Sequence, residues 1–168
     1  MVAVRRGAVR SVVVAGLLVV GGACGTGGAW GAGGVGDPTP GAEADVSYHG
    51  RVSLDEGRLR VWLVPHNEGP NALADTTLRV RLSEDLADRQ EPAEGCARAG
   101  RREVVCETGP LPAHGQGRHI ALVLGLREPV AEVVVRVDTL WNGDAADRNS
   151  GNNEHTVLAL DTGDAYAF

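Results

Sequence analysis

Residues 58–70 read RLRVWLVPHNEGP, and this stretch decides the fold class. Leu59, Val61 and Leu63 occupy alternate positions, with arginine or tryptophan between them. Such an alternation is typical of a half-buried β-strand, because successive side chains of a strand point to opposite faces. The run stops at residues 67–70, NEGP, which are turn-forming residues. The stretch therefore predicts a strand that ends in a turn.

The same pattern of short alternating runs separated by Gly, Pro, Asn and Asp continues downstream. Further runs lie at Leu78, Val80 and Leu82, at Ile120, Leu122, Leu124 and Leu126, and at Val133, Val135 and Val137. A last strand is expected within residues 154–161, where Val157 and Ala159 compete with Leu158 and Leu160 for the inward face. Short strands at this spacing predict an all-β domain. We expect an immunoglobulin-like antiparallel β-sandwich of about seven strands.

The composition changes along the chain and divides it into four parts. Residues 1–23 have a basic start, an apolar stretch and then small residues, which predicts a signal peptide that is removed on export. Residues 24–44 are rich in Gly, Ala and Pro and predict a flexible tether. Residues 45–161 are assigned to the β-sandwich domain, and residues 162–168 to a tail with a free C-terminus.

Cys24 directly follows residues 21–23, GGA, which resemble the lipobox of bacterial lipoproteins. The resemblance implies that Cys24 becomes the first mature residue and carries a lipid. The lipobox prefers leucine where this chain has Gly21, so cleavage after a nearby alanine, without lipid, stays open as the alternative. The odd count of three cysteines favours the anchor, because the other two form a natural pair.

Cys96 and Cys106 bracket a short segment of an exported chain, which predicts a disulfide across a hairpin or a tight loop. The alternatives are metal thiolates and a catalytic thiol. A metal site would need further cysteine or histidine ligands at short spacing, and the sequence has none there.

Charge and composition restrict the classes of partner. All sixteen basic residues are arginine, so the chain has neither a lysine for a nucleotide phosphate nor a lysine for a Schiff base. The net charge is −6, and the export segment contributes +3 through Arg5, Arg6 and Arg10, which leaves −9 for the remainder. An acidic domain repels phosphate backbones. We expect no nucleic-acid partner, and contact with a membrane only through a lipid on Cys24.

Two groups of residues stand out as candidate binding sites. Trp62 is out of step with the inward Leu59, Val61 and Leu63, which makes it a candidate contact surface, and packing beneath a neighbouring loop is the alternative. A polar loop offers closely spaced oxygen ligands for a calcium ion, and the alternative is that the same side chains cap turns. The loop residues are Asp144, Asp147, Asn149, Asn152 and Asn153.

Catalytic signatures are lacking in the sequence. No serine lies in G-x-S-x-G, and the five histidines are scattered without H-E-x-x-H spacing. Carboxylates such as Asp55, Glu56, Glu84 and Asp85 cluster in expected loops, but the sequence does not single out an acid/base pair among them.

The order of turns and breaks resembles the conserved-repeat domains of bacterial surface proteins, which are relatives of the cell-adhesion-related (CARDB-like) bacterial domains. The resemblance rests on residues 67–70, on the Cys96/Cys106 pair followed by residues 109–111, GPL, and on residues 144–153, DAADRNSGNN. It covers about Val46 to Leu160 and implies an immunoglobulin-like spacer or binding unit outside the cell. The chain departs from the family in its single copy and in Ser150, where proline is common.

These observations predict an exported, non-catalytic binding or structural module of the cell envelope, with calcium as its only candidate cofactor. An extracellular protein or a cell-wall glycan is the expected partner. Two alternatives remain: a small secreted enzyme, or an accessory domain of one, that uses loop carboxylates, and a free secreted factor.

Overall fold

The computed structural model describes residues 41–168, and the structural statements below concern these residues. The predicted signal peptide, Cys24 and residues 24–40 of the predicted tether lie outside the described residues. Within the described part, the chain forms strands and one 3₁₀ turn, η1 (Ser150–Asn152). No helix of this part has both the length and the apolar character needed to cross a membrane.

Seven strands have five or more residues, and five are shorter. The longer strands are β2 (Val46–Asp55), β3 (Arg58–Asn67), β4 (Thr77–Leu82), β6 (Glu103–Glu107), β8 (Ile120–Gly125), β9 (Glu132–Trp141) and β11 (His155–Leu160). The shorter strands are β1 (Glu43–Ala44), β5 (Cys96–Arg98), β7 (Gly115–Gln116), β10 (Ala146–Asp147) and β12 (Ala165–Ala167).

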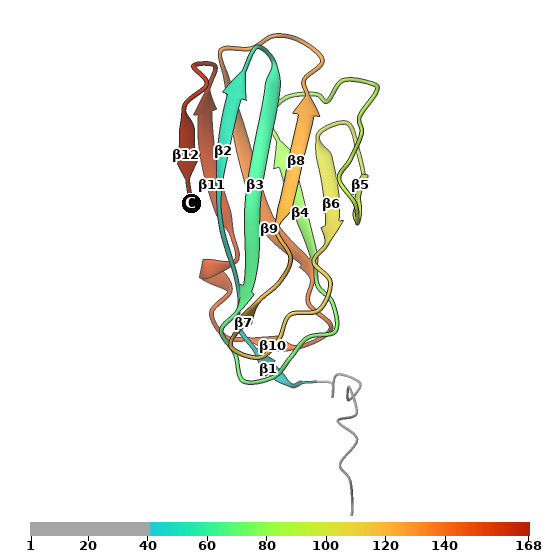
Figure 1. Ribbon diagram of the computed structural model, residues 1–168, viewed down its shortest axis with the longest axis vertical. Helices are drawn as coiled ribbons and strands as arrows, with labels where there is room; N and C mark the ends of the chain where they lie inside the picture. Colours follow the sequence, from blue (N-terminus) through green and yellow to red (C-terminus); the bar gives the residue numbers. More distant parts are fainter. Residues whose placement is uncertain (1–40) are drawn as a thin grey trace, which may run out of the picture. The chain divides into compact units, whose positions relative to one another are not determined.

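The strands form two main antiparallel sheets. The first sheet runs β12-β2-β3, and both β8 and β7 pair with β3. The second sheet runs β11-β9-β4-β6-β5. Figure 1 shows β2, β3 and β8 side by side in one layer, with β4 and β9 in the layer behind them. The longer strands are thus distributed as in an immunoglobulin-like sandwich, which confirms the predicted fold class. The predicted number of about seven strands matches the longer strands, and the five shorter strands come in addition.

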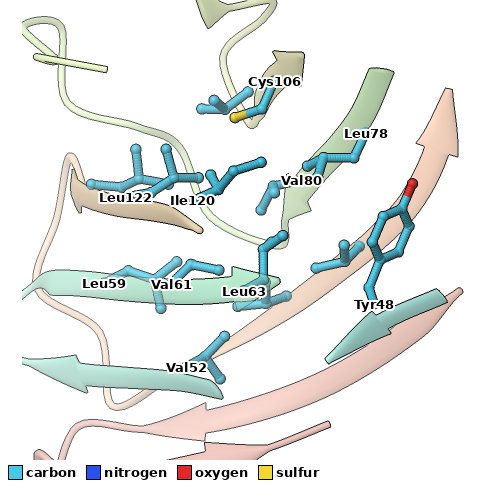
Figure 2. Packing of buried hydrophobic residues seen from close by; sticks show 14 of the residues in the cluster. Tyr48, Val52, Leu59, Val61, Leu63, Leu78, Val80, Cys106, Ile120 and Leu122 are labelled. Atoms are coloured by element: carbon cyan, nitrogen blue, oxygen red, sulfur yellow. The ribbon is translucent and has the colours of Figure 1, made fainter. Parts of the chain in front are cut away.

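The core lies between the two sheets and is filled by the alternating side chains that the sequence predicted. Leu59, Val61 and Leu63 of β3 are fully buried, as are Leu78 and Val80 of β4. Figure 2 shows these side chains together between the layers. Each buried leucine or valine stabilises the fold by about 2 kcal/mol relative to an exposed one. Because the inward side chains of both sheets are packed in this core, the outward side chains of each sheet stand at fixed positions.

The ambiguous strand β11 has Ala159 on its inward face and Leu158 and Leu160 on its outward face. Ala159 is fully buried, whereas Leu158 and Leu160 are 45% and 37% exposed. β11 pairs with β9 so that Ala159 lies opposite the buried Val133 and Leu158 lies opposite Val134. The sequence left open which alternate residues of β11 face inward, and the pairing with β9 decides this.

Glu56 and Gly57 form the two-residue turn between β2 and β3, with φ angles of 48° and 71°. Positive φ at both positions gives a turn whose twist matches that of the flanking strands. Glycine adopts this conformation freely because it lacks a Cβ atom. The turn fixes the register of the hairpin, in which Arg51 of β2 lies opposite Trp62 of β3.

The domain is longer at both ends than the predicted range of residues 45–161. Residues 162–168 were predicted as a free tail, but β12 pairs with residues 51–53 of β2, and Phe168 and Gly50 exchange two backbone hydrogen bonds of 2.9 and 3.0 Å. β1 lies within the predicted tether and pairs in parallel with β10. Strands of two or three residues are held by backbone hydrogen bonds to their neighbours. They are too short to show an alternation, so the sequence did not reveal them.

Cys96 and Cys106 are directly opposed in the β5–β6 pair. Their Sγ atoms lie 2.09 Å apart, which is the distance of a disulfide bond. Cys106 is buried on the inward face of the second sheet, whereas Cys96 is half-buried. The geometry thus fits the disulfide that the spacing predicted.

Candidate functional site

Trp62 lies near the middle of β3 and on the outer face of the first sheet. Its cross-strand neighbours are Arg51 of β2 and Ala121 of β8. The guanidinium carbon of Arg51 is 4.9 Å from the centroid of the Trp62 ring, within the range of a cation–π contact. The ring of His119, which directly precedes β8, stands edge-on at 5.1 Å and 84°. Trp62 is therefore half-buried by its neighbours on the outer face.

A hollow of about 240 Å³ lies beside the tryptophan. Residues that line it include Arg51, Ser53, Arg60, Trp62, Val123 and Ala165, and we call it the Trp62 hollow. Two cross-strand rows build the hollow. The first row is Arg51, Trp62 and Ala121, and the second is Ala165, Ser53, Arg60 and Val123. Short alanine and serine side chains flank longer ones in these rows, which leaves an open space between the longer side chains.

The register of three strand pairs assembles this site, and only part of it could be read from the sequence. Trp62 was identified because its phase along β3 opposes that of the core residues. Ala165 was missed because it lies on β12, in the predicted tail. Arg51 and Arg60 carried a signal, since both positions also alternate out of step with buried residues. Their neighbourhood, however, depends on which strands pair.

The two arginines of the hollow differ in their ion pairing. Nη1 of Arg60 lies 3.6 Å from Oδ2 of Asp55, and both side chains are half exposed. An exposed pair of this kind contributes little to stability, and the arginine stays available to a ligand. Arg51 forms no ion pair with any residue in the range 41–168. Arg51 is an exposed residue, and its guanidinium lies over the indole of Trp62.

Three of the five histidines, which looked scattered in the sequence, share the outer face of the first sheet. They are His49 on β2, His66 on β3 and His119 before β8. The rings of His49 and His66 meet edge-on with centroids 5.3 Å apart. Burial lowers the pKa of His66, and the neighbouring His49 lowers it further, while Glu68 opposes both effects. The net effect is a pKa of His66 below its ordinary value, which favours the neutral ring.

The polar loop of residues 144–153 is tied to the first strands of the domain. Oδ2 of Asp147 accepts hydrogen bonds from the backbone N–H of Val46 at 3.2 Å and from Nδ2 of Asn153 at 2.9 Å. Oδ1 of Asp147 accepts the backbone N–H of Asn149 at 2.9 Å. Asn152 donates from Nδ2 to Oδ1 of Asp45 at 2.8 Å. These contacts clasp the loop to the beginning of β2.

The same contacts bear on the calcium hypothesis. Both carboxylate oxygens of Asp147 already accept N–H groups, and Asp144 is an exposed residue with φ of 60°. In residues 41–168, no group of three or more His, Cys, Asp or Glu side chains is arranged to hold a metal ion. The loop thus forms a turn network in the structure, and a calcium ion on it stays a prediction.

The NEGP turn is stabilised at the same end of the sandwich. Oδ1 of the buried Asn67 accepts the backbone N–H groups of Gly69 at 3.0 Å and of Asp45 at 3.3 Å. Nδ2 of Asn67 donates to the backbone oxygen of Asn71 at 2.7 Å. A Cβ atom on Gly69 would lie 2.6 Å from the backbone of Ala44. The turn is therefore packed against β1.

Two of the candidate loop carboxylates, Asp85 and Asp55, form ion pairs with arginines. Asp85 pairs with Arg102 at 2.6 Å and also with Arg101, and these hydrogen bonds lower the pKa of Asp85. An ionised carboxylate held by two arginines is unsuited to donate a proton near neutral pH. Asp55 pairs with Arg60 on the other sheet, as described above.

Comparisons of the chain with protein-family models, curated proteins and solved structures find no match. The resemblance to the conserved-repeat domains of bacterial surface proteins therefore stays a prediction.

Proposed function

We propose that the chain is exported and acts at the cell envelope as a non-catalytic binding module. The signal-peptide pattern of residues 1–23 supports export. The disulfide distance between Cys96 and Cys106 supports an oxidising compartment, because disulfides persist there and are rare in the cytosol.

The observation that carries the binding role is the arrangement of Arg51 and His119 around Trp62. Tryptophan and arginine are the residues most enriched at the energetic centres of interfaces. Here they stand on paired strands, whose backbone hydrogen bonds keep them in place without a ligand. A site built on rigid strands loses little conformational entropy on binding. The partner we propose is a cell-wall glycan, and an extracellular protein is the other candidate.

A catalytic role is the rival from another class, as a small secreted enzyme or an accessory domain of one. Among the loop carboxylates that such an enzyme would use, Asp85 pairs with Arg101 and Arg102, and Asp55 pairs with Arg60. This arrangement favours binding over acid/base catalysis. A free secreted factor differs from a lipoprotein by the acyl chains on Cys24, and the intact mass of the exported protein distinguishes the two.

The test is co-sedimentation of the mature, full-length exported protein with purified peptidoglycan. Trp62→Ala is expected to weaken binding at least tenfold, because it removes the central aromatic ring of the Trp62 hollow. Trp141→Ala is the matched control, since Trp141 is 47% exposed at the end of β9 in the second sheet. Circular dichroism and urea unfolding establish that both variants are folded.

Two results would count against the proposal. Equal sedimentation of wild type and Trp62→Ala would show that the Trp62 hollow does not bind the peptidoglycan. Release of soluble sugar from the peptidoglycan, lost on substitution of a loop carboxylate, would establish the enzyme instead.

A further inference from the structure

The outer face of the first sheet is basic although the domain is acidic. The chain has a net charge of −6, and residues 1–40 contribute +2 through three arginines and Asp37, so the described part carries −8. On the outward positions of β2 and β3, Arg51, Arg58 and Arg60 stand against the single acid Asp55. A local excess of positive charge on a negative domain attracts an anion to this face specifically.

Arg51 is placed to bind a planar anion. Its guanidinium carbon lies over the Trp62 ring at 4.9 Å, and this cation–π contact favours that position of the group. The N–H groups of a guanidinium lie in its plane and form a fork that matches the two oxygens of a carboxylate. Because Arg51 has no ion pair within residues 41–168, a ligand carboxylate displaces no protein carboxylate from it.

Arg60 provides a second cation at the same hollow. It stands on β3 two residues before Trp62 and lies opposite Ser53, whereas Arg51 lies opposite Trp62. Both arginines line the hollow, with Ser53, Ala121 and Ala165 as its short side chains. The space of about 240 Å³ is below the size of a typical drug-sized pocket and suits one small unit of a polymer.

We infer that the Trp62 hollow binds a carboxylate-bearing polysaccharide, with Arg51 and Arg60 holding the carboxylate and with Trp62 and Val123 contacting the sugar ring. This inference rests on the proposed binding function and names its ligand class. The position of the hollow favours a glycan over an acidic peptide. Peptides that bind sheets commonly add a strand at a free edge, whereas β2 and β3 are paired with strands on both of their sides.

The experiment measures binding of the mature, full-length protein to oligomers of polygalacturonate by calorimetry. Fully methyl-esterified oligomers of the same length are the matched ligand, because the ester keeps the sugar and removes the charge. We expect binding to polygalacturonate only, weaker as salt increases. Arg51→Gln is expected to lower the affinity at least tenfold, because the charge and the fork are lost. Arg136→Gln, which removes an exposed arginine of the second sheet, is expected to leave the affinity unchanged.

Each other outcome overturns the inference. Equal binding of the methyl ester would show that the carboxylate is not recognised. Poly-glutamate is the second comparison ligand, and equal binding of it would assign the site to acidic peptides. A lack of binding to polygalacturonate, together with Trp62-dependent sedimentation with peptidoglycan, would reject the ligand class and leave the proposed function standing. A lack of both would reject the proposed function as well.

Discussion

The phenol oxygen of Tyr48 lies 2.7 Å from the hydroxyl oxygen of Thr139, and this hydrogen bond joins the two sheets of the sandwich. Tyr48 belongs to β2 in the first sheet, and Thr139 to β9 in the second. Tyr48 is fully buried, so its hydroxyl requires a partner inside the protein. Figure 2 shows its ring reaching from the first sheet toward the second. The contact provides a polar point of alignment between two apolar faces.

The first prediction concerns this contact. Tyr48→Phe is expected to lower the free energy of unfolding by about 1–2 kcal/mol, because the Thr139 hydroxyl loses its partner. Thr139→Val should cost a similar amount for the same reason. The double variant removes both polar groups, so its loss is expected to be smaller than the sum of the two single losses. Urea unfolding of the four proteins measures the coupling, and strictly additive losses would show that the hydrogen bond contributes nothing.

The second prediction concerns alkaline pH. Burial raises the pKa of Tyr48 from 10.0 to about 12. The uncharged phenol is thus favoured in the folded state, and the resulting stability is fully present below pH 10 and is lost as the pH rises toward 12. The loss amounts to roughly 3 kcal/mol. The chain has no lysine, so no lysine titration overlaps this window.

Tyrosinate absorbance measures this shift directly. The chain has two tyrosines, and in a Tyr166→Phe variant the absorbance of the folded protein reports Tyr48 alone. The titration is expected near pH 12 in the folded protein and near pH 10 in urea. A midpoint near 10 in both conditions would contradict the burial effect.

The alternation predicted β3, β4, β8, β9 and β11, because five or more residues are enough to display it, but it did not single out β6. It also placed Trp62 outside the core, since the phase of β3 is unambiguous around Leu59, Val61 and Leu63. It could not predict that His49, His66 and His119 share one face. Their proximity depends on the pairing of β2, β3 and β8, which is a non-local property. The phase of β11 and the existence of β12 depended on strand pairing in the same way.

The third prediction concerns the disulfide. Reduction of Cys96–Cys106 is expected to lower the free energy of unfolding by about 3 kcal/mol, as the chain-entropy model gives for a closed loop of 10 residues. The measurement is urea unfolding with and without reductant in a Cys24→Ser variant, which leaves a single pair of thiols. A variant with Cys96→Ser and Cys106→Ser should match the reduced protein and should not respond to reductant. Unchanged stability on full reduction would contradict the expectation.

The fourth prediction concerns the turn of residues 67–70. Gly69→Ala is expected to lower the free energy of unfolding by about 1–3 kcal/mol, because the new Cβ atom would lie 2.6 Å from the backbone of Ala44 and β1 would have to move. Gly151→Ala is the control, since nothing lies within 4 Å of the corresponding Cβ position. Its effect should stay within about 0.5 kcal/mol. Similar thermal shifts for the two variants would show that the turn is not tightly packed on β1.

The last prediction distinguishes the two roles of the polar loop. Asp147 accepts three hydrogen bonds, from the backbone of Val46, the backbone of Asn149 and the side chain of Asn153. Asp147→Ala leaves these donors without their acceptor and is expected to destabilise the domain by about 2–3 kcal/mol. The loss should be the same in the presence of a chelator and in the presence of calcium, because the hydrogen bonds require no ion. Asp144→Gly is the comparison, since no side-chain hydrogen bond of Asp144 is formed within residues 41–168 and glycine adopts its positive φ of 60° without strain. It should be near neutral under both conditions.

If calcium raises the unfolding temperature of the wild type and both variants abolish that rise, the loop is a calcium site, because a turn network alone gives no such response.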